Sequence, residues 1–207
     1  QCIQALENGI RLAEQAAQEG IVTLGTGEMG IANTTAATAL YCAYLNLAPQ
    51  DITGPGTGLG NAGIAHKIQV ISSALELHAS CIRAADPIDI LAALGGFEIA
   101  TLTGLLLGGA SLRQALVIDG FISTSALVAA RAICPPVLDY AFFSHVSAEP
   151  GFQPVLQALN ARPLLNLGLR LGEGTGAAMA IFLLRCAANI YTDMATFAAA
   201  NVHSGPK

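Results

Sequence analysis

Three glycines surround a single carboxylate in residues 170–176, which read Arg-Leu-Gly-Glu-Gly-Thr-Gly. Glycine tolerates positive φ and carries no Cβ, so this spacing lets the backbone approach a bulky ligand closely. The apolar run that begins at Ala177 predicts a buried helix, with Glu173 at or near its N-terminus. Backbone N–H groups are unpaired there and the helix dipole favours anions. Glu173 is therefore either a first-turn cap of a core helix or a group that acts on a ligand, and the flanking glycines favour the ligand.

A second glycine-spaced segment, residues 25–35, follows a short apolar strand expected at 21–24. A strand, a glycine turn and a helix N-terminus form the usual place for an α/β protein to hold a phosphate or another anion. The spacing matches neither a Walker loop nor a clean GxGxxG. The alternative is an ordinary turn with Asn33 or Thr34 as N-cap. Glu28 and the extra polar groups beside these residues favour a functional site, because a plain turn needs only one.

A third glycine-rich segment, residues 54–63, leads into Lys67 and a helix that continues to about His78. A loop of this composition is not kept rigid by its own sequence, so order around a ligand is the economical explanation. The alternative is a surface linker followed by a solvated lysine. Because Lys207, the last residue, is the only other lysine, the sequence favours Lys67 as a partner for an anionic ligand.

Two further polar clusters follow predicted strands. Asp119 ends the strand expected at 115–120, where ligands of parallel sheets collect, and it would either bind substrate or cap a helix at 123–133. The strand after that leads into His145 and Ser147. No G-x-S-x-G elbow is present, which argues against a nucleophile triad. We interpret His145 as a hydrogen-bonding loop residue and Ser147 as a contact for a phosphate or carboxylate.

The remaining pattern predicts a doubly wound, mostly parallel α/β sheet flanked by helices, Rossmann-like in outline, with the glycine loops converging at the C-terminal ends of the strands. The expected strands lie at 21–24, 115–120 and 140–143, and the expected helices at 2–18, from the mid-thirties to about 47, 64–78, 87–94, 97–107, 123–133, 152–160 and 194–202. No linker divides residues 1–207, so we expect a single nucleotide-binding and catalytic domain with a C-terminal helix in about 190–207.

Composition limits the class of protein. Hydrophobic residues make up 53% of the 207 residues and charged ones 11%, with a mean hydropathy of +0.57, so a membrane protein must be considered. Residues 29–50 are uncharged but contain asparagines and a proline, and 99–112 are too few for a span of about 20 residues. We expect no membrane association. The apolar excess instead predicts oligomerisation, because large apolar patches are rare on soluble monomers.

The net charge of −5 argues against nucleic acid as a partner, which needs a basic face. The five cysteines are an odd number without CxxC spacing, and they are expected to be reduced core thiols in a cytoplasmic protein. The chain begins at Gln1 without an initiator methionine and without a signal or transit pattern, which predicts a piece of a longer protein.

The polar segments together resemble one family, nicotinate-nucleotide:dimethylbenzimidazole phosphoribosyltransferase. The resemblance rests on segments 27–35, 54–67, 95–98, 117–121, 144–149 and 170–178 in that order, and it covers essentially all 207 residues. The resemblance implies that this chain is the larger, C-terminal part of a family member. The N-terminal region that the chain lacks helps to close the aromatic base pocket in this family. The resemblance also implies transfer of the 5-phosphoribosyl group of nicotinate mononucleotide to 5,6-dimethylbenzimidazole in cobalamin lower-ligand synthesis, with no metal and no cofactor. The oligomer expected from the apolar excess is a homodimer.

The resemblance also implies roles for individual residues. Glu173 matches the general base, and Glu28 is placed near the ribose or the reacting centre. The residues implied in substrate binding are Glu28, Gly30, Asn33, Thr34, Thr35, Gly58, Lys67, Ser147, Leu171, Gly172 and Gly174. The alternative is a nucleotide-binding module without turnover, either truncated or paralogous.

Overall fold

The sheet at the centre of the chain consists of three short parallel strands. In the computed structural model, which describes residues 1–202, these are β1 (Thr23–Gly25), β2 (Ala115–Ile118) and β3 (Ala141–Phe143), in the order β1-β2-β3. Leu24 is paired with Leu116, and Val117 with Phe142. All three strands lie within about two residues of the predicted positions, as expected for short apolar runs bounded by turn residues.

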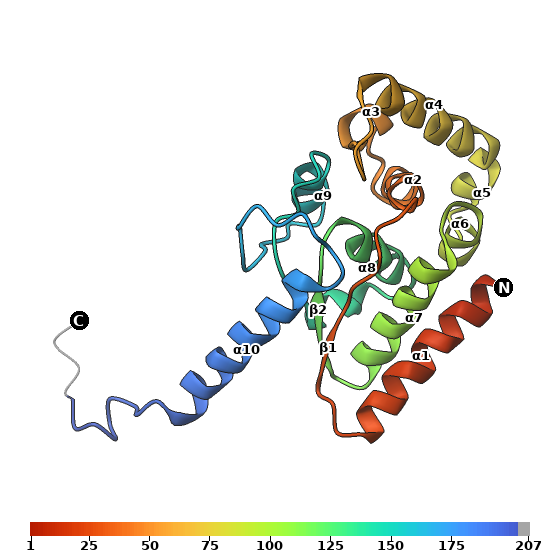
Figure 1. Ribbon diagram of the computed structural model, residues 1–207. Helices are drawn as coiled ribbons and strands as arrows, with labels where there is room; N and C mark the ends of the chain where they lie inside the picture. The colour runs from red at the N-terminus through yellow and green to blue at the C-terminus, as the bar shows by residue number, and fades with distance from the viewer. Residues whose placement is uncertain (203–207) are drawn as a thin grey trace.

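Different helices cover the two faces of β2 (Figure 1). Leu116 and Ile118 face the large core, which includes residues of α1 (Cys2–Gln18), α7 (Phe97–Ser111) and α8 (Phe121–Ile133). Val117 points to the opposite face, because side chains alternate along a strand. There it packs only on a small cluster from α10 (Thr175–Asp193). The predicted parallel α/β sheet with helices on both faces is confirmed.

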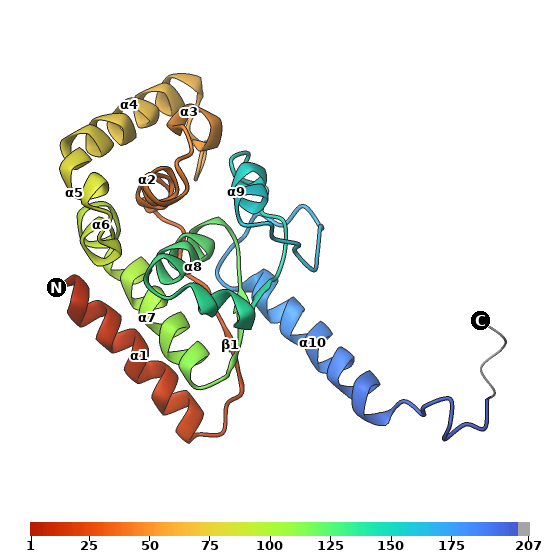
Figure 2. The ribbon, with the colours of Figure 1, turned by 180° about the vertical axis from the view of Figure 1, so that it is seen from behind.

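The remaining helices lie around α8. Helices α2 and α6 pack against α8, and α9 contacts α2 and α3 (Figures 1 and 2). Their bounds are α2 Thr34–Leu45, α3 Pro49–Ile52, α4 Asn61–Leu77, α5 Ala79–Ala84, α6 Pro87–Leu94 and α9 Phe152–Ala158, and a 3₁₀ helix covers Pro135–Tyr140.

Helix α6 begins at the predicted residue, and the residues that stabilise its N-terminus are its immediate neighbours in the sequence. Pro87 occupies the first turn, and the Asp86 carboxylate accepts from the N–H groups of Ile88 (2.9 Å) and Asp89 (3.1 Å). Aspartate followed by proline is a strong helix-start signal, because the side chain satisfies free N–H groups and the ring presets φ.

Helix α7 shows a correction. The sequence predicted that Gly108 and Gly109 end the helix at residue 107, but the helix continues through them to Ser111. A Cβ on Gly108 would lie 3.0 Å from Ala13 and Ile10 of α1, and one on Gly109 would lie 2.7 Å from the Leu116 side chain. These glycines therefore allow close packing on α1 and β2 and are not a stop signal.

Helix α10 shows the largest departure. It was predicted to be buried, yet only Gly176, Ala177 and Ala180 are buried, while Phe182 is 67% and Tyr191 90% exposed. The helix projects away from the other elements in both ribbon views (Figures 1 and 2). Within residues 1–202 it is the one helix long and apolar enough to cross a membrane by length and composition, a test that core helices of soluble proteins also pass. The stretches weighed from the sequence as membrane spans did not include it.

Two smaller predictions near the C-terminus and on the thiols were wrong. Residues 194–202 form bends and turns, because α10 ends at Asp193 and Met194 adopts an extended conformation. The rest of the C-terminal helix expected in about 190–207 lies outside the described residues. All five cysteines are free, but Cys134 and Cys186 are exposed and so are not core thiols.

Candidate active site

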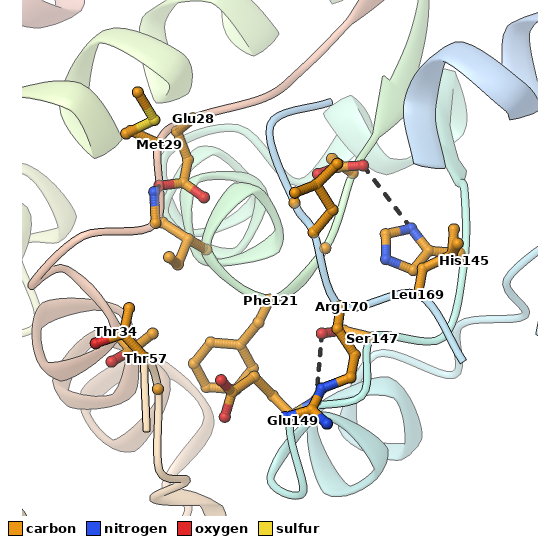
Figure 3. A pocket seen from close by; sticks show the side chains of 17 residues that line it. Glu28, Met29, Thr34, Thr57, Phe121, His145, Ser147, Glu149, Leu169 and Arg170 are labelled. Carbon is orange, nitrogen blue, oxygen red and sulfur yellow. Dashed lines mark hydrogen bonds and ion pairs between the residues drawn. The ribbon is translucent and has the colours of Figure 1, made fainter. Parts of the chain in front are cut away.

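A cavity lies at the C-terminal ends of the strands, where the glycine-rich segments meet (Figure 3). The strand ends and loops after β1, β2 and β3 each contribute, together with the segments that precede α4 and α10. Its wall consists of Glu28, Met29, Gly30, Thr34, Gly56, Thr57, Asp119, Gly120, Phe121, Ile122, His145, Ser147, Glu149, Leu169, Arg170, Leu171 and Gly172.

Glu28 is held in place at the cavity by its own loop. Its Oε2 accepts from the Gly30 N–H at 2.5 Å and from Asn33 Nδ2 at 2.8 Å, and Asn33 Nδ2 also lies 3.3 Å from Glu98 Oε1. Asn33 is the N-cap residue of α2, as one interpretation predicted, but its side chain makes no capping bond. The asparagine orients the carboxylate instead. Neither Asn33 nor Thr35 lines the cavity.

Lys67 lies behind the cavity wall. It is 6% exposed, and its Nζ donates to Thr34 Oγ1 at 2.6 Å and to the Gly54 carbonyl at 3.3 Å. A Cβ on Gly56 would lie 3.7 Å from Nζ. Burial lowers the pKa of Lys67, and the nearby charge of Glu149 opposes that shift. A buried ammonium with uncharged hydrogen-bond partners favours an incoming anion. The surface-linker alternative does not fit this burial.

Gly58 belongs to the same segment but stands apart from Lys67. It has a φ of +123°, and a Cβ there would meet no atom within 4 Å. It does not line the cavity, so the structure brings Lys67 and Thr34 together but leaves Gly58 outside.

Asp119 caps a helix, although not the one that the sequence suggested. Its Oδ2 accepts from the Gly174 N–H at 3.2 Å and its Oδ1 from the Ala177 N–H at 3.1 Å, both at the start of α10. The N-cap of α8 is Gly120, without a side-chain bond. Asp119 is 3% exposed and also lines the cavity.

His145 lies next to Asp119 in the cavity wall, and Figure 3 shows their contact as a dashed line. Its Nδ1 lies 3.8 Å from Asp119 Oδ1 and 2.9 Å from Ser144 Oγ. Burial lowers the pKa of His145, and the Asp119 charge opposes that shift. The predicted hydrogen-bonding role of His145 is confirmed. Ser147 lines the cavity, and its Oγ accepts from the Glu149 N–H at 3.3 Å.

Glu173 lies at the start of α10, as predicted. It has a φ of +56° between Gly172 (+74°) and Gly174 (+79°), and Gly174 is the N-cap. Its side chain is exposed, and the cavity wall includes Leu171 and Gly172 but not Glu173 or Gly174. The Glu28 loop touches this segment directly, since a Cβ on Gly27 would lie 2.6 Å from the Gly174 nitrogen.

Some residues of the cavity wall were not predicted individually. Phe121, Glu149 and Arg170 all line it, and each ends or begins a polar segment already marked from the sequence. A position at either end of a polar segment that follows a strand or precedes a helix was therefore the signal that could have found them. The described residues contain no group of three or more His, Cys, Asp or Glu side chains placed to hold a metal ion.

Comparison with known proteins defines the class first. A family model described as phosphoribosyltransferase matches residues 1–202. Relatives called nicotinate-nucleotide–dimethylbenzimidazole phosphoribosyltransferase are 60% identical in Solidesulfovibrio magneticus, over 99% of this chain, and 55% identical in Chlorobium chlorochromatii, over 97%. The crystal structure of CobT from Thermus thermophilus superposes on 99% of this chain with a TM-score of 0.92 at 43% identity. The chain belongs to the nicotinate-nucleotide–dimethylbenzimidazole phosphoribosyltransferase family.

The match covers nearly all of this chain but only part of each relative. The chain spans 58% of the Solidesulfovibrio relative, 56% of the Chlorobium relative and 60% of the Thermus chain. It therefore corresponds to somewhat more than half of a typical family member.

Proposed function

We propose that the protein to which this chain belongs transfers the 5-phosphoribosyl group of nicotinate mononucleotide to 5,6-dimethylbenzimidazole. The products are α-ribazole 5′-phosphate and nicotinate. The observation that carries the proposal is the family match over residues 1–202, together with relatives of that name at 55–60% identity. The position of the cavity supports it, because ligands of parallel sheets bind at the C-terminal ends of the strands.

The side of the cavity next to α4 is suited to the phosphate. Lys67 supplies a buried positive charge, and its Nζ donates to the hydroxyl of Thr34, which lines the cavity together with Gly56 and Ser147. Charge-assisted hydrogen bonds to phosphate are about twice as strong as neutral ones. We assign Glu28, held by Gly30 and Asn33, to the ribose or the reacting centre.

The opposite side is suited to the aromatic base and the proton transfer. One benzimidazole nitrogen attacks the anomeric carbon in line, the bond to nicotinate breaks with its electron pair on the leaving nitrogen, and the configuration inverts from β to α. Glu173 accepts the proton of the other ring nitrogen. Exposed Met29 and Leu171 at the cavity wall offer apolar surface for a flat ring. Catalytic hydrogen bonds commonly form only in the substrate complex, which fits an exposed Glu173 beside the cavity.

The second candidate is a nucleotide-binding module without turnover. It is favoured by the incomplete coverage of the relatives, since a missing region can remove part of the base pocket. An assay of the full-length parent and of the 207-residue chain, side by side, separates the two. The enzyme releases nicotinate only when benzimidazole is added, whereas a module binds nicotinate mononucleotide and releases none.

We further propose that the parent protein is a cytoplasmic homodimer in which a second copy covers the exposed face of α10. Phe182, Ile190 and Tyr191 on that helix are 58–90% exposed, and such patches are rare on soluble monomers. The free cysteines fit a reducing compartment. Sedimentation of the parent at micromolar concentration tests the dimer. A monomer would reject it and would leave the rest of the parent chain to cover this face.

A further inference from the structure

The backbone of Asp119 is tied to the ends of both neighbouring strands. Its N–H donates to Thr26 Oγ1 at 3.0 Å, just after β1, and its carbonyl accepts from Ser144 Oγ at 3.2 Å, just after β3. All three residues are buried, none of them more than 3% exposed. These bonds hold the Asp119 backbone at the edge of the sheet, and its carboxylate extends from there.

From this position the carboxylate reaches a segment 55 residues further along the chain. Its two oxygens accept from the Gly174 and Ala177 N–H groups at 3.2 and 3.1 Å. Gly174 is the N-cap of α10 and has no side chain to perform this function. Asp119 thus does at long range what Asp86 does locally for α6.

The Gly174 N–H belongs to the peptide unit that begins at the Glu173 carbonyl, so the first of these bonds fixes the orientation of that peptide. Glu173 adopts a φ of +56°, a left-handed conformation that is unfavourable for a residue with a Cβ and is held only when the surroundings impose it. Other parts of the chain pack closely against the residues on both sides of this peptide. A Cβ on Gly27 would lie 2.6 Å from the Gly174 nitrogen, and one on Gly176 would overlap the ring of His145, which lies next to Asp119.

We propose that Asp119 is a positioning residue that orients Glu173 toward the reacting base by anchoring the start of α10 to the sheet. The inference rests on the proposed role of Glu173 as the general base. It assigns no contact between Asp119 and substrate. Misplacing a catalytic group by about 1 Å can cost about 100-fold in rate, so an anchor one peptide away from the base has a measurable effect on turnover.

The first test replaces Asp119 in the full-length parent. Asp119→Asn keeps one acceptor oxygen but presents an NH₂ group to the second N–H. We expect kcat to fall about 10- to 100-fold, while KM for nicotinate mononucleotide changes by less than about twofold. The matched control is Asp86→Ala, which removes the oxygen that accepts both N–H groups at the start of α6 and should leave kcat unchanged. An unchanged kcat for Asp119→Asn, or a loss confined to KM, would overturn the inference.

The second test asks whether Asp119 acts through Glu173. In a Glu173→Gln background, Asp119→Asn should lower the remaining rate by less than about twofold, because groups that act as a unit are not additive. Full additivity would mean that Asp119 acts by another route and would overturn the inference while the proposed function stands. If Glu173→Gln alone retains full activity, the assignment of the base fails, and the inference fails with it.

A milder variant keeps the inference testable if Asp119→Asn does not fold. Thr26→Val removes the hydroxyl that accepts from the Asp119 N–H and leaves the carboxylate in place. We expect kcat to fall about 3- to 10-fold, again only when Glu173 is present. A folded Thr26→Val parent with wild-type kcat would overturn the inference.

Discussion

The two sides of the cavity each bury one charged side chain, but they use the charge differently. Lys67 donates to a hydroxyl and a carbonyl, both uncharged, and so retains its attraction for an incoming anion. The Asp119 carboxylate instead accepts two backbone N–H groups at the start of a helix. From this difference we expect the Lys67 side to bind the anionic ligand and the Asp119 side to hold the start of α10 in position.

This comparison makes separate predictions for binding and for turnover. A change on the α10 side should alter the rate at nearly constant nucleotide affinity. A change on the Lys67 side should alter affinity first.

The largest effect is expected for Glu173→Gln in the full-length parent. Glutamine keeps the shape and reach of the side chain but cannot accept a proton at neutral pH, and general-base assistance is typically worth about 10² to 10⁴ in rate. Turnover should fall by about that factor, while the dissociation constant of nicotinate mononucleotide changes little. Single-turnover kinetics and calorimetry measure the two. A near wild-type rate would show that Glu173 is not the general base, and Glu28 would be the next candidate for that role.

Lys67→Met should weaken binding of nicotinate mononucleotide by about 1.5 to 3 kcal/mol, the usual range for a hydrogen bond to a charged group. Calorimetry on the parent checks the value. Arg83→Met, which removes a positive charge from the last turn of α5, is the control and should leave affinity unchanged. Unaltered affinity in Lys67→Met would show that Lys67 does not contribute to nucleotide binding. The proposed difference between the two sides of the cavity would then be wrong.

Gly176→Ala should destabilise the chain by about 1 to 3 kcal/mol, the usual cost of overpacking, because the new Cβ would overlap the His145 ring. Urea denaturation measures this. The control is the same substitution in a His145→Ala background, where the ring is absent. There Gly176→Ala should be neutral or stabilising, and an equal loss in both backgrounds would place the clash elsewhere.

The smallest effect concerns pH. Because burial lowers the pKa of His145 in the folded state, the unfolded chain binds the proton more readily as the pH falls through about 6.5. The free energy of unfolding should therefore decrease between about pH 7 and 5. It should decrease less steeply in His145→Gln, which has no imidazole at that position. Parallel pH profiles for the two proteins, measured by urea denaturation, would show that protonation of His145 is not coupled to folding.

Much of the architecture could be predicted because its signals are local. The α6 helix was predicted with its observed bounds, since Asp86 and Pro87 act within the first turn. The strands were found from short apolar runs. Glycines were harder to interpret. Gly108 looks like a stop signal, yet it is inside α7 because α1 packs against it, and that contact joins residues far apart in the sequence.

The candidate site was predicted in part for the same reason. Glu28, Thr34, Ser147 and Leu171 line the cavity, and each belongs to a polar or glycine-rich segment that follows a strand or precedes a helix. Asn33, Lys67 and Gly174 act one layer behind the wall, through Glu28, Thr34 and Asp119. Sequence spacing shows that such residues are near a site, but it does not show which of them reach the surface of the cavity.

The sequence by itself determined the strand and loop order, the start of α10 beside Glu173 and the family. Only the tertiary structure decided that Asp119 caps α10, because that contact spans 55 residues and depends on the sheet register. It also decided that α10 is mostly exposed. Apolar composition indicates a need for burial, but on α10 only the small residues Gly176, Ala177 and Ala180 are fully buried. Ile181 and Leu184 pack partly buried against the Val117 cluster, and Phe182, Ile190 and Tyr191 are exposed.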